Sequence, residues 1–445
     1  MDSPVRRHHL KTLTKTDRDA LLNRTESNLG RYLTSVGPII DAVKESGDEA
    51  LVRFARDFDQ VELTTGSIRA RPEDFDAAFS SINTANPELV DSIRFAADSI
   101  RMFHQAQMPD PMRMNEVRPG VFCGEKIAPI PSVACYVPRG KGSFPSVVLM
   151  TTIPAVVAGV KNVCILTPPG PDGSVDDATL VAARIAGVET IYKCGGAQAV
   201  AAAAFGTETI PRADKIVGPG SPWVVAAKQV LADKIDPGPP AGPSESIVFA
   251  DETADGKLAA LDLIIESEHG PDSSAFLVTP SAEVADEAQK AIPSYWELLG
   301  ETRRSFSQTV LGGSIGGIVL AENNTDCIRF INDYAPEHLM IHSLEPFRYL
   351  GDIHHAGEVL LGRHTAISLG NYVLGPNAVL PTSGAARIHS PLGVHDFLKA
   401  TGIGYVTSGA YDELAAHAHN LAVYEGFDGH ALAVSELRKK LLSGG

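Results

Sequence analysis

The chain has 445 residues, of which 44% are hydrophobic, 21% are charged and 6% are aromatic. This composition excludes collagen-like, low-complexity and wholly disordered proteins, and the length allows roughly two to four domains at ~150 residues each. Asp and Glu number 54 against 38 Lys and Arg, so the formal net charge is -16. Because this charge repels phosphate backbones and anionic membrane surfaces, we expect neither nucleic acid nor a membrane as a partner.

The cysteines and the N-terminal residues bear on where the protein resides. The five cysteines are scattered and form no CxxC pair. An odd, scattered set fits neither a disulfide framework nor a cysteine zinc site. The first residues are of mixed charge without an apolar core, which argues against a secretory signal, and every apolar run is shorter than the ~20 residues of a membrane span. We therefore expect a cytoplasmic protein.

The first part of the chain has a helical pattern. From Leu33 to about Gln107, apolar residues such as Ile39 and Val43 recur at three- and four-residue spacing, which predicts mostly helix. From Val133 onward, short β-branched runs alternate with Ala-rich amphipathic segments, as in βαβ units. The strands predicted in this half are 133–137, 163–166, 190–192 and 215–217.

The same alternation restarts after the Pro- and Gly-rich loop at 236–243. The strands predicted there are 246–250, 275–278, 317–320, 339–341 and 359–361. Buried parallel strands need crossover helices, which are predicted at 146–158, 222–232, 257–268 and 325–334. The predicted fold class is α/β: two tandem Rossmann-like parallel-sheet domains with a helical N-terminal region and a C-terminal helical tail. The predicted limits of these four parts are 1–120, 121–240, 241–385 and 386–445.

Two glycine-containing loops follow predicted strands, at 194–198 and 218–221. Helix N-termini at such positions of open α/β sheets bind anions. Neither loop carries GxGxxG, and that motif occurs nowhere in the chain, so these residues predict a small anionic or nucleotide ligand without specifying NAD. Tight strand-to-helix turns that need glycine explain the loops equally well.

Three of the fourteen histidines lie beside carboxylates and turn residues. They are His269 with Glu266, His338 with Glu337, and His430 with Glu425. The first pair is three residues apart near the end of a predicted helix, so both side chains can reach one metal ion. The second pair precedes a strand, from which it can enter a cleft, and the third flanks a Gly-bearing turn. A solvated helix end, a surface loop and a helix boundary remain the alternative interpretations.

A long loop at 368–382 contains two asparagines, Asn371 and Asn377, among Gly and Pro residues. Such a loop inside an α/β half is often functional, although a plain surface connection fits it as well. The chain contains no HExxH or phosphate-loop motif, which argues against HExxH metalloproteases and P-loop enzymes.

Taken together, these segments resemble the histidinol dehydrogenase family of zinc-dependent, NAD-linked enzymes, which oxidise a primary alcohol to a carboxylate in two hydride transfers. The resemblance covers roughly Ala134 to the C-terminus, and several blocks in family order are far more specific than any single one. The matching blocks are YVPRGKGSFPSVVLMTTIPAVVAGV, GGAQAVAAAAFGTETIP, DKIVGPG, PAGPSESIVFAD, EHGPDS, APEHL, VLPTSGAAR and EGFDGHA.

The resemblance implies a role for each matching residue. His338 would take the hydroxyl proton in each oxidation, and Glu337 would activate the water that hydrates the aldehyde. The implied NAD contacts are Tyr136, Gln198 and Ser221, and the implied zinc ligands are Glu266, His269, Asn371 and His430. The implied substrate-binding residues are Ser244, Glu266, His269, His338, Asn371, Ala378, Glu425 and His430. The resemblance further implies a homodimer whose C-terminal tail brings Glu425 and His430 to the partner's site.

Four of these positions depart from the family. Glu266 stands where the family usually has Gln, and Asn371 stands where it has Asp. The carboxylate and the amide have thus exchanged positions, and the total formal charge of the ligands is unchanged. Ala378 replaces a His and Ser221 an Asn. Because a site built for particular polar groups rejects analogues strongly, these changes favour a paralogue that oxidises a polar primary alcohol other than L-histidinol, such as an amino alcohol or a sulfonated diol. Authentic L-histidinol dehydrogenase is the first alternative, and a non-catalytic binding protein or a non-redox enzyme is the second.

Overall fold

The computed structural model describes residues 4–22, 29–140 and 142–443. The chain divides into two compact units. The first unit comprises the chain up to Gln107 together with Ile130–Phe397, and the second comprises Met108–Pro129 together with the chain from Leu398 onward. Within the described ranges, every helix is too short or too polar to span a lipid bilayer.

The first lobe of the first unit contains a four-stranded parallel sheet with the order β6-β5-β4-β7. Its strands are β4 (Ser132–Tyr136), β5 (Asn162–Thr167), β6 (Ile191–Lys193) and β7 (Lys215–Val217). The helices that connect or follow them are α5 (Pro145–Ala158), α6 (Asp177–Ala186), α7 (Gly196–Phe205) and α8 (Pro222–Val230). Because the chain runs outward through β5 and β6 and then returns to β7, a topological switch point lies between β4 and β7.

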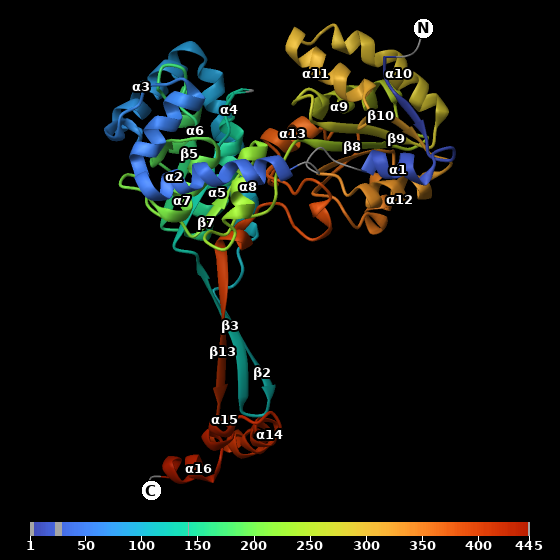
Figure 1. The fold of residues 1–445 in the computed structure, drawn as a ribbon. Coiled ribbons are helices and arrows are strands. Elements are labelled where there is room, and N and C mark those ends of the chain that lie inside the picture. The colour runs from blue at the N-terminus through green and yellow to red at the C-terminus, as the bar shows by residue number, and fades with distance from the viewer. Residues whose placement is uncertain (1–3, 23–28, 141, 444–445) are drawn as a thin grey trace. The chain divides into compact units, whose positions relative to one another are not determined.

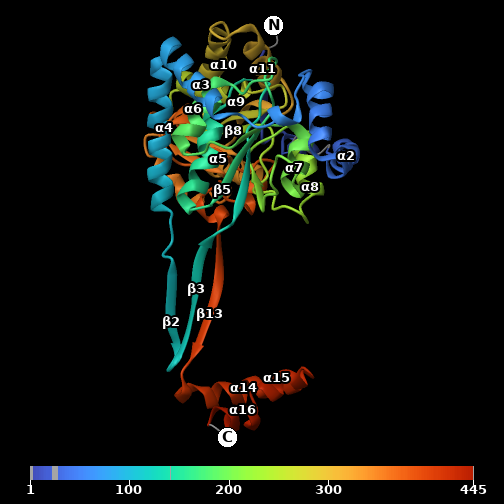
Figure 2. The same ribbon diagram turned by 90° about the vertical axis from the view of Figure 1, so that its left-hand side faces the viewer.

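Three N-terminal helices pack against this lobe: α2 (Gly30–Phe54), α3 (Pro72–Ala85) and α4 (Pro87–Ala106) (Figure 2). α2 contacts α7 and α8, whereas α3 and α4 contact α6. Apolar residues of α2 such as Val36, Ile40 and Val43 join the core formed by the first sheet and α7, which is the face predicted by their three- and four-residue spacing.

The second lobe contains a six-stranded parallel sheet with the order β1-β10-β9-β8-β11-β12. Figure 1 labels its strands β8, β9 and β10. Its strands are β1 (Arg7–His9), β8 (Glu245–Ala250), β9 (Ser274–Thr279), β10 (Gly316–Leu320), β11 (His338–His342) and β12 (Glu358–Leu361). Its helices are α1 (Lys15–Leu22), α9 (Gly256–Ser267), α10 (Ala282–Trp296), α11 (Glu301–Gly312), α12 (Asn324–Tyr334) and α13 (Ile367–Tyr372). A second switch point lies between β8 and β11.

Both faces of the six-stranded sheet are buried, and alternate residues of each strand face opposite sides. On β8, Val248 packs into the core shared with α9, α10 and α11. Its neighbours Ile247 and Phe249 pack into the core shared with α12. This two-sided burial explains why the strands appear in the sequence as continuous apolar runs.

The second unit is a three-stranded antiparallel sheet followed by three helices. β3 (Val121–Pro129) lies between β2 (Met112–Arg118) and β13 (Leu398–Val406) (Figure 2). The helices are α14 (Tyr411–Tyr424), α15 (Asp428–Ala433) and α16 (Glu436–Leu442). The backbone N–H of Thr407 donates to the carbonyl of Gly120 at 2.9 Å, which fixes the end of β13 at the turn between β2 and β3.

Short helical turns complete the described residues. They are the π-helical η2 (Ala55–Asp59) and the 3-10 turns η3 (Thr65–Ser67), η4 (Pro346–Asp352), η5 (Ala385–Arg387), η6 (Val394–Phe397) and η7 (Ser408–Ala410).

The predicted fold class is confirmed, and each predicted strand coincides with an observed one within about two residues, as expected for element boundaries. Four strands were not predicted: β1, β2, β3 and β13. Most side chains of β2 and β13 are exposed on both faces, so these strands lack the apolar pattern that reveals a strand. The C-terminal tail, which the sequence predicts to be helical, thus begins with the strand β13 before its helices. The predicted limits of the four domains stay a prediction.

Candidate active site

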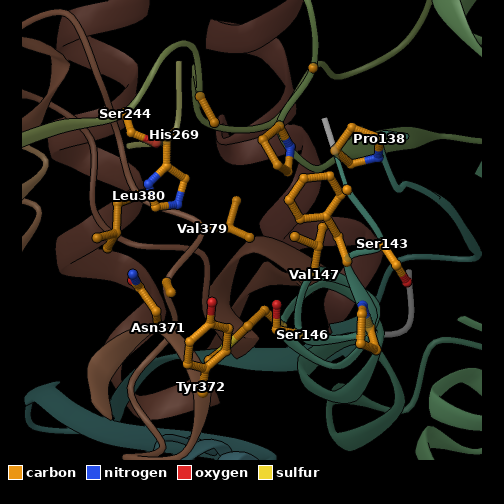
Figure 3. Close-up of a pocket in the computed structure, with 18 of the residues that line it drawn as sticks. Pro138, Ser143, Ser146, Val147, Ser244, His269, Asn371, Tyr372, Val379 and Leu380 are labelled. Carbon is orange, nitrogen blue, oxygen red and sulfur yellow. The ribbon is translucent and has the colours of Figure 1, made fainter. Parts of the chain in front are cut away.

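A cavity of about 900 Å³ in the first unit is lined by residues from both lobes. Figure 3 shows Ser244, His269 and Asn371 on one side of it and Ser143 and Val147 on the other. In the first lobe it lies at the carboxyl ends of β4 and β7, beside the switch point, where open α/β sheets bind ligands. In the second lobe it lies at the opposite, amino-terminal ends of β8 and β11.

The predicted acid–base pair lies in this cavity. Ala335, which ends α12, is buried and has a positive φ of 53°, a conformation that non-glycine residues adopt mainly where the surroundings enforce it. This turn leads directly to Glu337 and to His338, the first residue of β11. Glu337 Oε2 accepts a hydrogen bond from the backbone N–H of Glu245 at 2.8 Å. Its Oε1 lies 3.8 Å from Nε2 of His338, so both groups face the same space.

Burial and neighbouring charges perturb both members of the pair. Burial raises the pKa of Glu337 to about 8; His338 opposes this shift, and Glu266 adds to it. Burial by itself would lower the pKa of His338, but Glu337, Glu266 and Glu358 together raise it above its ordinary value of 6.5. Perturbed groups that converge in a cleft are typical of acid–base catalysts.

Three of the predicted metal ligands cluster at the carboxyl end of α9. Glu266 is 1% exposed, and its Oε1 accepts a hydrogen bond from Nδ2 of Asn371 at 2.9 Å. Its Oε2 lies 3.2 Å from Nδ1 of His269. That Nδ1 also lies 3.1 Å from the carbonyl of Ile265, so Nε2 of His269 is the ring nitrogen left to face the cavity.

The electrostatics of this cluster suit a cation. Burial would raise the pKa of Glu266, but the imidazoles of His269 and His338 and hydrogen bonds from Asn371 and Ser244 outweigh burial and lower it. Glu266 therefore stays ionised. The carboxyl end of a helix carries partial negative charge, and α9 ends at this cluster.

The chemistry of these side chains fits zinc, which takes imidazole nitrogen and carboxylate oxygen. Between residues 4 and 443, apart from the undescribed positions 23–28 and 141, no group of three or more His, Cys, Asp or Glu side chains is arranged to hold a metal ion. One unit alone thus offers one carboxylate, one imidazole and one amide. A fourth ligand would have to come from elsewhere, as the predicted role of His430 requires.

The predicted cofactor residues differ in their access to the cavity. Tyr136, at the end of β4, lines it, and its hydroxyl accepts a hydrogen bond from the backbone N–H of Gly196 at 3.1 Å. Ser221, which precedes α8, lines it as well. Gln198 lies behind Gly196 and is only 4% exposed, so it contributes to the loop more than to the cavity surface.

The remaining predicted residues divide between the two units. Ser244 and Ala378 line the cavity. Glu425 and His430 belong to the second unit, where both are exposed around the turn between α14 and α15. Their roles stay predictions.

The sequence interpretation missed three residues of the site. Glu358 begins β12 and lies 3.0 Å from His338. Arg303 on α11 lines the cavity, and its Nη1 donates to the carbonyl of Glu268 at the end of α9 at 3.0 Å. Tyr372 lines the cavity beside Asn371. A single acidic residue at the head of an otherwise apolar strand, as in EVLL, was the available signal for Glu358.

An α/β fold whose cavity contains a buried carboxylate–imidazole pair with perturbed pKa values is typical of enzymes that use acid–base chemistry. The sequence profile described as histidinol dehydrogenase matches residues 22–438. The chain therefore belongs to the histidinol dehydrogenase family, whose members are oxidoreductases.

Individual relatives match over their whole lengths. "Histidinol dehydrogenase homolog 2" of Mesorhizobium japonicum is 57% identical, over 99% of this chain and 100% of the relative. "Histidinol dehydrogenase" of Synechocystis is 46% identical, over 97% of this chain and 99% of the relative. A crystal structure of histidinol dehydrogenase from Elizabethkingia anophelis superposes with a TM-score of 0.93 at 32% identity and covers 100% of both chains.

Proposed function

We propose that this protein is a zinc-dependent, NAD-linked dehydrogenase that oxidises a polar primary alcohol, through the aldehyde to the carboxylate, and that its substrate is not L-histidinol. The observation that carries the proposal is the contact between Glu266 and Asn371 within one cavity with Glu337 and His338. The acid–base pair is retained, whereas the groups that would anchor the substrate have changed.

The residues of the cavity suit each step. When bound, zinc would supply positive charge beside the substrate oxygen, and NAD would accept a hydride. Nε2 of His338 would take the proton of the alcohol hydroxyl as the hydride leaves the carbon. Glu337, whose raised pKa suits a proton acceptor near neutral pH, would take a proton from the water that adds to the aldehyde. Once His338 has released the first proton to solvent, its Nε2 would accept the proton of the hydrate while a second NAD would accept the second hydride.

The departures at the ligand positions support a different substrate. Ala378 lines the cavity with a methyl group at the position where the resemblance implies an imidazole, so one hydrogen bond to the substrate is missing. Loss of a polar contact of this kind discriminates strongly between substrates. Relatives at 57% and 58% identity are described as histidinol dehydrogenase homologs, and one at 46% as histidinol dehydrogenase, which agrees with a paralogue without identifying its substrate.

A homodimer is part of the proposal. The helices of the second unit expose many large apolar side chains, which is typical of a surface that a partner covers. They include Leu421, Val423, Tyr424, Phe427, Leu432, Leu437, Leu441 and Leu442. In such a dimer Glu425 and His430 would complete the partner's site. A cytoplasmic location remains a prediction from the cysteines, all five of which are free.

The test is NADH formation by the zinc-loaded protein on L-histidinol, amino alcohols and sulfonated diols, with metal content measured on the same sample. Turnover of another alcohol without turnover of L-histidinol supports the proposal. Robust turnover of L-histidinol, with two NADH per substrate, would instead make this an authentic histidinol dehydrogenase. A protein that binds neither NAD nor zinc and oxidises no alcohol would be a binding protein on the same fold.

A further inference from the structure

We propose that Glu358 is a positioning residue that accepts a hydrogen bond from Nδ1–H of His338, so that in the neutral imidazole Nε2 is the unprotonated nitrogen and faces the substrate. This inference rests on the proposed function, because it assigns Glu358 to the base of that reaction. It is independent of which alcohol is oxidised.

The sheet itself places the two side chains together. β11 and β12 are adjacent parallel strands, and His338 and Glu358 are paired at the first position of each. Both residues are buried, at 3% and 8% exposure. Oε2 of Glu358 lies 3.0 Å from Nδ1 of His338. In a hydrogen bond with this carboxylate the natural donor is the ring nitrogen, so the contact favours the tautomer with its proton on Nδ1.

The carboxylate of Glu358 also lies close to the backbone of α13. A Cβ atom on Gly370 would come within 2.9 Å of both of its oxygens, so a larger residue there would displace this carboxylate. Gly370 lies in α13 and directly precedes Asn371. Glu358 therefore lies between the proposed base and the helix that carries one of the proposed zinc ligands.

A purely structural role explains this carboxylate poorly. Oε1 of Glu358 is buried and has no hydrogen-bond partner among the residues that the structure describes. Leaving a buried acceptor unpaired costs stability, and an apolar side chain at the edge of the sheet would avoid that cost. His338, by contrast, gains a defined tautomer, a fixed ring orientation and a more basic Nε2.

The second lobe contains a matched control for this contact. Nε2 of His342, four residues further along β11, lies 2.7 Å from Oδ2 of Asp262 on α9, and both residues are buried. This pair has the same chemistry on the same strand, but neither residue lines the cavity. Asp262→Asn should therefore disturb folding much as Glu358→Gln does, without touching the base.

The experiment compares Glu358→Gln, Glu358→Ala and Asp262→Asn on the zinc-loaded, full-length enzyme with its best alcohol. Gln can still accept from Nδ1–H but lacks the charge, so Glu358→Gln should lower kcat by about 10-fold and Glu358→Ala by about 100-fold. KM for NAD should stay within about twofold, because a change confined to the base alters turnover more than cofactor binding. Asp262→Asn should keep kcat within about threefold of the parent enzyme.

The pH profile supplies a readout that loss of packing does not move. The carboxylates that face His338 are Glu337, which directly precedes β11, Glu266 from α9 and Glu358 from β12. Each raises the pKa of His338, so removing one charge must lower it. The rise of kcat with pH, which follows deprotonation of His338, should accordingly shift to lower pH in Glu358→Gln and should not shift in Asp262→Asn. Equal losses of kcat and an unshifted rise in both variants would overturn the proposal.

The tautomer of His338 separates failure of this inference from failure of the proposed function. If no alcohol reduces NAD, the proposed function is wrong, but ¹⁵N chemical shifts of labelled histidine, assigned with His338→Asn, still report the ring. The spectra are recorded above the pKa of His338, where the ring carries one proton. That proton on Nδ1, retained in Glu358→Gln and lost from Nδ1 in Glu358→Ala, supports positioning by Glu358. The single proton on Nε2 in the unsubstituted protein refutes it, whatever the activity.

Discussion

Exchanging the two residues of the Glu266–Asn371 contact tests whether the ligand cluster is a rearranged form of the family's set. The variants are Glu266→Gln, Asn371→Asp and the double variant. Nδ2 of Asn371 donates to the buried carboxylate at 2.9 Å, and a hydrogen bond to a charged group contributes about 1.5–3 kcal/mol. Asn371→Asp removes the donor and adds a like charge, so the metal-free protein should lose about 3 kcal/mol or more of unfolding free energy.

The double variant should recover most of this loss. With Gln at 266 and Asp at 371, the amide again donates to a carboxylate and only the direction is reversed. The two substitutions should therefore be non-additive by about 1–3 kcal/mol. Zinc affinity should follow the ligand charge: weaker in Glu266→Gln, tighter in Asn371→Asp, and near the parent value in the double variant.

Urea unfolding of the metal-free proteins measures the first effect, and competition with a chelator measures the second. Additive stability changes in the double variant would show that Glu266 and Asn371 do not interact. Zinc affinity that is the same in all four proteins would show that neither residue is a ligand.

The other predictions concern the base and the cofactor loop. His338→Ala should lower kcat at least ~10²-fold, and near-normal kcat would remove it from the role of base. Tyr136→Phe removes the acceptor for the backbone N–H of Gly196; we expect KM for NAD to rise about 3–10-fold with kcat nearly unchanged, and the opposite pattern would contradict the assignment. Because the pKa of His338 is raised and the base must be deprotonated, kcat should increase with pH, with a midpoint above pH 6.5. A midpoint below pH 6.5 would contradict this prediction.

Much of the fold could be predicted because the strands of both lobes are buried on both faces. Segments such as Ser246–Ala250 are continuous apolar runs between helical segments, and such runs identify parallel strands. The strands of the second unit escaped prediction for the opposite reason. LKATGIGYV in β13 buries none of its side chains, so its pairing with β3 depends on backbone hydrogen bonds that leave no pattern in the sequence.

The candidate site shows the same division. Glu337 and His338 could be singled out because a carboxylate and an imidazole stand together before a strand. Glu358 could not, since its contact with His338 joins residues 20 positions apart and depends on the register of β11 with β12. Register is a property of the sheet. The sequence also predicted that ligands bind at the carboxyl ends of the strands. In the second lobe the cavity lies instead at the amino-terminal ends of β8 and β11, because α9 runs back along the sheet and ends there.

The strand β1 has a consequence for how this chain matures on the ribosome. Nε2 of His8 contacts the carbonyl of Gly316 at 3.1 Å, across 308 residues of sequence. At synthesis rates of about 5–20 residues per second, the amino-terminal segment waits about 15–60 s for the strand that it pairs with. Throughout that interval Val5, which is buried in the core of the folded protein, lacks the side chains that later cover it. The first lobe therefore has time to fold before the sheet of the second lobe is complete.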